Sequence, residues 1–268
     1  MFKDCLSFAI NKKDIHLLTQ DFIMTTQSTN RQASQYARLG GVLYLLIIVA
    51  GIFAQVFVRS KLIVSGDADA TAANIIANEL LFRSGVAAEL MMLIFDVALA
   101  LIFYVILRPI NKNLALFAAF LRITMSSISA INSLNQMDVL LWLKTPASLA
   151  FSPEAINALA YHSLKAHSFG YHIALVFFGF YCMSIGVLIF RSNFLPKVLG
   201  ILMVIASISY LINSFVSILA PNLASYLGMF ILLPALVAEL SLALWLTIKG
   251  VNMKQYDLQL NVLSKKEL

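Results

Sequence analysis

Six blocks of about twenty apolar residues divide the chain, and they constrain its fold more than any other feature. A helix of that length rises about 1.5 Å per residue and so crosses a hydrocarbon core of about 30 Å. Charged residues make up only 12% of the 268 positions, whereas a soluble domain has about 25%. We therefore predict an all-α polytopic membrane protein, a bundle of about six transmembrane helices.

Short polar connectors separate the predicted spans. The spans cover residues 39–58, 86–107, 114–143, 171–190, 198–219 and 227–248. Ser152-Pro153-Glu154 is typical of a helix start, because serine caps a first turn and proline suits its first position. A helix that begins there can continue into the fourth span. Pro234 falls inside the sixth span, where it predicts a kink.

The chain is predicted to have three parts. Residues 1–35 form a polar tail that we expect to be disordered, with Met24 as an alternative start to Met1. Residues 36–252 form the six-helix transmembrane domain, and residues 253–268 form a polar C-terminal tail. No apolar run typical of a signal peptide precedes the first span, so that span is expected to direct insertion.

Basic residues predict the orientation of the bundle. Both tails and the two connectors on their side hold 13 of the 19 Lys and Arg residues, the opposite connectors hold five, and Arg122 lies within a span. Because cytoplasmic loops have an excess of Lys and Arg, we predict that both termini are cytoplasmic and that the protein lies in the cell inner (cytoplasmic) membrane. The net charge of +6 is then expected to interact with anionic headgroups of the lipid bilayer, and no pattern predicts a nucleic-acid partner.

Three ionisable residues inside the spans form a candidate charged layer: Asp96, Arg122 and Glu239. A charge at mid-bilayer costs at least about 2.5 kcal/mol unless it is paired or hydrated. Counted from the cytoplasmic ends of their spans, the three lie roughly 12 to 17 Å deep. In one interpretation the layer lines a hydrated cavity, in which Arg122 holds an anionic group or the two acids relay a proton. In the other, Arg122 forms an ion pair with Asp96 or Glu239 that orients the helices.

A polar stripe begins at Arg122. Ser126, Ser129, Ser133 and Gln136 follow it at steps of four, three, four and three residues. This spacing puts all five side chains on one helical face. We expect that face to look into the bundle.

A second candidate cluster, Glu89, Asp138 and His172, is predicted near the outer membrane face. Two carboxylates and an imidazole suit a divalent metal or a pH-sensitive site, but side chains near the headgroups also reach water, and this ordinary placement is favoured. His162, His167 and His172 recur every five residues, which turns them about 140° apart around a helix. We therefore predict no metal or cofactor.

No catalytic motif supports an enzyme. The chain has no phosphate-binding glycine loop, zinc-protease helix or nucleophile elbow, and its serines have no evident base. The sequence therefore indicates an integral membrane protein of unknown molecular function, with two alternatives. One is a small transporter or channel for a small solute or ion, which would have a small-molecule ligand, and the other is a membrane-embedded sensor or accessory subunit, which would have a protein partner.

Several motifs resemble a known family in their order. They include Ala37-Arg38-Leu39-Gly40-Gly41, Ala88-Glu89-Leu90, Phe120-Leu121-Arg122, Phe194-Leu195-Pro196-Lys197-Val198-Leu199-Gly200 and Ala238-Glu239-Leu240. Over residues 36–252 the chain resembles the bacterial membrane proteins grouped as domain of unknown function 4386. The resemblance implies a six-helix bacterial membrane protein and brings no assigned activity, substrate or catalytic residue. The family pattern often has an acid soon after the span-three arginine, and its absence here leaves Arg122 more dependent on Asp96 and Glu239.

Overall fold

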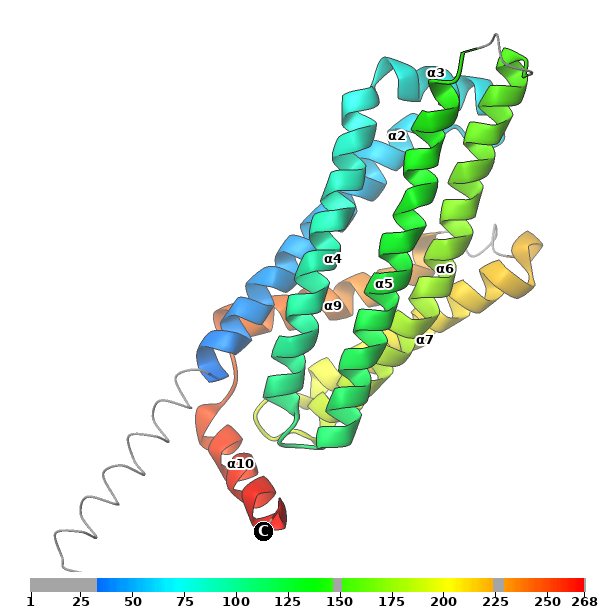
Figure 1. Ribbon diagram of the computed structural model, residues 1–268. Helices are drawn as coiled ribbons and strands as arrows, with labels where there is room; N and C mark the ends of the chain where they lie inside the picture. The colour runs from blue at the N-terminus through cyan, green and yellow to red at the C-terminus, as the bar shows by residue number, and fades with distance from the viewer. Residues whose placement is uncertain (1–32, 147–150, 224–228, 268) are drawn as a thin grey trace, which may run out of the picture.

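The computed structural model describes residues 33–146, 151–223 and 229–267, and within them it is all-α, without a strand (Figure 1). Among these residues, six helices are long and apolar enough to cross a membrane, which confirms the predicted fold class. They are Ala33–Leu62, Glu79–Leu107 (α4), Lys112–Leu143 (α5), Pro153–Arg191 (α6), Lys197–Leu219 (α7) and Phe230–Ile248. The predictions for Met24 and for most of the N-terminal tail concern residues outside these ranges.

The first span changes its helical form before it ends. It is α-helical from Ala33, becomes the π-helix η1 over Phe53–Arg59, and closes with the short helix α2, Ser60–Leu62. Gly85 of α4 lets this segment come close, because a Cβ there would lie 2.9 Å from a methyl carbon of Val58. The π-helix ends at Arg59, which it places against α4.

The long helix α6 is the centre of the bundle. Its 39 residues begin at Pro153, where the Ser152 hydroxyl accepts a hydrogen bond from the Ala155 N–H at 3.3 Å, as the sequence predicted. It packs against α5, α7 and the short helix α3, Ala68–Ala77. At about 1.5 Å per residue α6 is far longer than α7. With α3 and the adjoining parts of α4 and α5, it therefore extends beyond α7 and α9 at one end of the bundle, here called the α3 end (Figure 1).

The structure of the sixth span corrects the prediction that Pro234 kinks it. A 3₁₀ turn, η2 (Met229–Leu232), precedes helix α9, Leu233–Ile248, and Pro234 is the second residue of α9. A residue in the first turn has no helical hydrogen bond to lose, so proline fits there. The predicted kink inside this helix is wrong, because the helix begins at the proline.

The opposite end of the bundle holds the start of the first span, the α4–α5 and α6–α7 turns, and the C-terminal helix α10, Met253–Glu267 (Figure 1). We call it the basic end, after Arg108, Lys112, Arg191 and Lys197. The buried Tyr256 attaches α10, because its hydroxyl donates to the Val105 carbonyl at 3.2 Å. The predicted polar C-terminal tail is thus a docked helix.

Apolar side chains cover the outside of the bundle along its length, while the charged side chains of Glu89, Asp96, Arg122 and Glu239 are buried within it. Ile94, Phe120 and Val198 are each at least 58% exposed, although they lie in the middle or at the start of long helices. The Arg122 side chain, by contrast, is 0% exposed. An apolar outer surface of this kind suits contact with lipid chains, because they are apolar and offer no hydrogen-bond partners.

Candidate functional site

Each of the six spans contributes one polar side chain to a buried layer near the middle of the bundle. This central polar layer consists of Tyr44, Asp96, Arg122, Tyr181, Tyr210 and Glu239, of which Tyr210 is half-buried and the others are buried. Each residue lies about 14 to 20 Å along its helix from the basic end, at a rise of about 1.5 Å per residue. Polar groups from every span therefore meet at one depth.

Arg122 and Asp96 form an ion pair at the centre of this layer. The Nε and Nη2 atoms of Arg122 both donate to Oδ1 of Asp96, with Nε at 3.0 Å. The two side chains are 0% and 3% exposed. Of the two acids that the sequence left open as partners, the structure pairs Arg122 with Asp96.

Three aromatic rings surround the Arg122 guanidinium. Its Cζ atom lies 4.7 Å from the ring centroid of Tyr181, 5.3 Å from that of Tyr44 and 5.5 Å from that of Phe178. A cation is attracted to the negative face of such rings, most strongly where water is excluded. The rings partly replace hydrogen bonds, since Nη1 of Arg122 makes none to a described residue.

Glu239 lies in the same layer but is bonded differently. Its Oε1 accepts a hydrogen bond from the Tyr210 hydroxyl at 2.5 Å. Within the part of the chain that the structure describes, no hydrogen bond or ion pair joins Glu239 to Arg122. The structure thus brings the three predicted residues to one depth and pairs only two of them.

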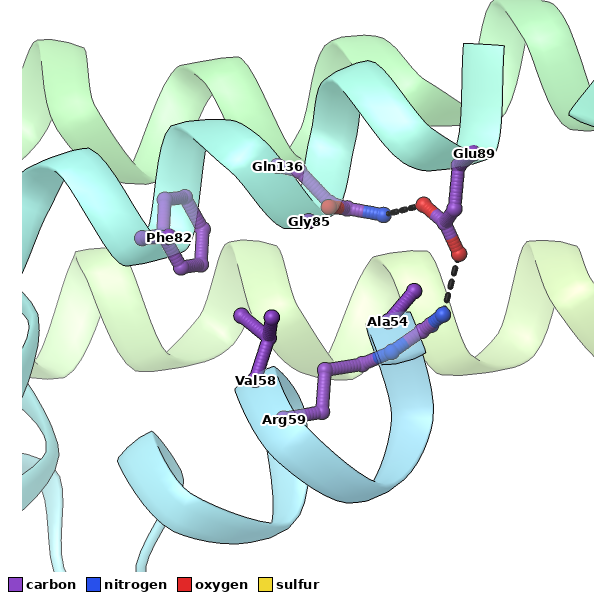
Figure 2. Close-up of a pocket in the computed structure, with 7 residues that line it drawn as sticks. All are labelled: Ala54, Val58, Arg59, Phe82, Gly85, Glu89 and Gln136. Carbon is purple, nitrogen blue, oxygen red and sulfur yellow. Dashed lines mark hydrogen bonds and ion pairs between the residues drawn. The ribbon is translucent and has the colours of Figure 1, made fainter. Parts of the chain in front are cut away.

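A second polar group, the outer polar site, lies nearer the α3 end and consists of the half-buried Arg59 and the buried Glu89, Gln136 and His167. Figure 2 shows Arg59 and Gln136 both donating to the Glu89 carboxylate, one to each oxygen. The Nε2 atoms of Gln136 and His167 are 2.6 Å apart, and His167 Nε2 lies 3.8 Å from Oε2 of Glu89. The first span, α4, α5 and α6 therefore meet at one carboxylate.

Two small cavities adjoin Glu89. One has a volume of about 10 Å³ and is lined by Ala54, Val58, Arg59, Phe82, Gly85, Glu89 and Gln136 (Figure 2). The other, of about 20 Å³, is lined by Glu89, Met92, Leu93, Ser129, Asn132, Ser133, His167 and Tyr171. Each has room for about one water molecule. The second cavity reaches Ser133 and Ser129, two members of the polar stripe on α5.

The stripe faces inward, as its spacing predicted. Arg122, Ser126, Ser133 and Gln136 are buried, and Ser129 is half-buried. The stripe connects the two polar groups described above, because Gln136 at one end bonds Glu89 and Arg122 at the other end bonds Asp96. About 21 Å of helix separates these ends.

The predicted outer cluster does not come together. Asp138 accepts hydrogen bonds from Trp142 Nε1 at 3.0 Å and from the Ser163 hydroxyl at 2.6 Å, and His172 lies 3.5 Å from the Asn213 amide. Only Glu89 belongs to the outer polar site. No group of three His, Cys, Asp or Glu side chains that could hold a metal ion occurs among the described residues.

The family model described as "Domain of unknown function (DUF4386)" matches residues 39–250, nearly the whole of the six-span region. The chain belongs to the DUF4386 family. This confirms the resemblance drawn from the sequence motifs.

A relative of this DUF4386 chain is an uncharacterized protein of Archaeoglobus fulgidus. The two are 26% identical over 165 residues, which cover 62% of this chain and 83% of the relative. No solved structure matches. Neither the family description nor the relative names an activity, so a function for this DUF4386 protein has to be argued from its own geometry.

Sequence reasoning overlooked several residues of these two groups in the DUF4386 chain. Arg59 directly follows the predicted first span, where a flanking basic residue is ordinary, and the five-residue spacing of the histidines gives His167 no partner. Tyr44, Tyr181 and Tyr210 are uncharged, so a search for ionisable residues inside the spans passes over them. The similar depth of all six residues, about 14 to 20 Å from the basic end, is the signal that would have found the tyrosines.

Proposed function

We propose that this DUF4386 protein is a multi-pass protein of the cytoplasmic membrane that transports a small polar solute or ion. In this proposal the outer polar site is the opening, and the stripe on α5 is the path from Glu89 to the central polar layer. The observation that carries it is the continuity of that stripe: its five side chains are buried or half-buried, and its ends bond Glu89 and Asp96. Ionisable residues inside membrane helices by default mark solute, ion or proton pathways, and charged pairs lie at both ends of this stripe.

The proposed orientation places both termini in the cytoplasm. It rests on the excess of Lys and Arg at the basic end. The outer polar site then faces the opposite side of the membrane. Glu89 lies about 27 Å along α4 from Leu107, close to the far boundary of a hydrocarbon core of about 30 Å.

The described conformation is a closed one in this proposal. The cavities beside Glu89 have room for single waters, and the charged pair below them is buried. Opening would require the wall formed by the π-helical segment, which carries Ala54, Val58 and Arg59, to move away from α4. Single π-helical turns recur at functional sites, which supports a role for this wall.

A membrane-embedded sensor or accessory subunit is the second candidate. The observation that favours it is the Asp96–Arg122 pair, which is closed off from solvent and surrounded by aromatic rings. A buried pair of this kind can have a purely structural role, in which it orients the helices and takes no part in transport. The two candidates differ in whether water ever reaches the stripe.

Cysteine accessibility separates these candidates. In a full-length chain with Cys5→Ser and Cys182→Ala, Ser126→Cys is compared with Ser127→Cys, a neighbour at the same depth whose side chain is exposed on the outside of the bundle. Because only an ionised, hydrated thiol reacts, transport predicts that a membrane-impermeant maleimide labels Ser126→Cys at least about tenfold faster than Ser127→Cys. Ser133→Cys should react faster still. Equal, negligible labelling of Ser126→Cys and Ser127→Cys would contradict transport and favour the accessory subunit.

A further inference from the structure

The central polar layer contains one more carboxyl group than it has cations. Both hydrogen bonds of Arg122 go to Asp96, and the carboxyl of Glu239 has the Tyr210 hydroxyl as its hydrogen-bond donor. The other titratable groups facing Glu239 are uncharged ones: Tyr44 from the first span and Cys182 and Tyr171 from α6. If Asp96 and Glu239 were both ionised, the layer would carry an uncompensated negative charge.

Such a charge would be costly where it lies. Glu239 is 7% exposed and sits about 14 Å along α9 from the basic end. Burying an unpaired carboxylate costs far more than burying the neutral acid, so such groups keep a proton instead. The surroundings of Glu239 therefore favour the neutral, protonated form of its carboxyl group.

We propose that Glu239 is a proton-binding site in the middle of the membrane. Tyr210 donates to Oε1, which leaves Oε2 to carry the proton. A metal cation fits less well, because hard cations take six or more oxygen ligands and no group of three His, Cys, Asp or Glu side chains that could hold one occurs among the described residues. When the layer is hydrated, the Oε2–H bond breaks, the proton passes to water, and the carboxylate that forms becomes a second candidate partner for Arg122.

This inference has two parts that can fail separately. Protonation of Glu239 follows from the charge balance of the closed layer alone. Release of that proton during transport rests on the proposed function. A protonated Glu239 together with an unreactive Ser126→Cys would support the site and reject the transporter.

Infrared spectroscopy of the full-length protein in liposomes tests the site. At neutral pH, we expect the carbonyl stretch of a protonated carboxylic acid, lost in Glu239→Gln and retained in Glu154→Gln, which changes an exposed acid at the start of α6. Asp96→Asn should also remove the band, because Arg122 then lacks its counter-ion and draws Glu239 into the ionised form.

Tyr210→Phe provides a variant that leaves the acid in place. It removes the hydrogen bond to Oε1, so the band should move to higher frequency without being lost. Absence of the band in the unmodified protein, or a band unchanged in Glu239→Gln, would overturn the proposal. If Glu239→Gln does not fold, a band at an unchanged frequency in Tyr210→Phe would overturn it equally.

Discussion

Replacement of Arg122 by methionine is expected to destabilise the folded protein by about 3 to 5 kcal/mol, because it leaves the buried Asp96 carboxylate without a counter-ion. Methionine preserves most of the apolar stem, so the loss would come chiefly from the charge and from the contacts of the guanidinium with the three rings. The free energy of unfolding, measured in mixed detergent micelles with increasing dodecyl sulfate, gives the difference.

Arg83→Met is the matched control for this experiment. Arg83 pairs with Glu79 one helical turn away, at 2.7 Å, but its side chain is 42% exposed. An exposed pair of this kind contributes at most about 1 kcal/mol. If Arg122→Met costs no more than Arg83→Met, the buried pair does not stabilise the bundle.

Gly41→Ala is expected to force the first span away from α9. A Cβ at Gly41 would lie 2.4 Å from the backbone nitrogen of Thr247 and 2.8 Å from the carbonyl oxygen of Ala243. Backbone atoms cannot move aside as a flexible side chain can, so the helices must separate. Overpacking of this kind typically costs about 1 to 3 kcal/mol, and the same unfolding titration measures it.

Gly51→Ala makes the same substitution in the same span as a control. Its nearest neighbour would be the Met92 sulfur at 3.7 Å, an ordinary contact. Because alanine favours helix by up to about 1 kcal/mol over glycine, this variant should be as stable as the unmodified protein or more so. Equal effects at the two glycines would show that the first span does not approach α9 as closely as the structure has it.

The fold was predictable because its main signals are local in sequence. Apolar blocks long enough to cross a membrane gave six helices, and counting residues from their ends gave the shared depth of Asp96, Arg122 and Glu239. The spacing of the stripe on α5 gave its inward face. Each of these inferences needs only the rise or the period of one helix.

The partners within the candidate site were not predictable in this way. Depth does not say which helices are neighbours, so counting could not choose Asp96 over Glu239 as the partner of Arg122. The outer cluster was proposed from depth alone, and the structure gives Glu89 quite different neighbours, Arg59, Gln136 and His167. The apolar run before Arg59 is typical of any membrane helix and does not indicate the π-helical turn that brings Arg59 to Glu89.

A double-mutant cycle on Asp96→Asn and Arg122→Met tests most directly whether charges from separate spans are joined inside the bundle. Arg122→Met leaves the Asp96 carboxylate without its cation, and Asp96→Asn takes from Arg122 the acceptor of both its hydrogen bonds, whereas the double variant leaves neither side chain charged. We predict that the double variant is more stable than either single one, with a coupling free energy of about 2 kcal/mol or more. Losses that simply add would show that the two side chains do not interact, and would contradict the pairing on which the central polar layer depends.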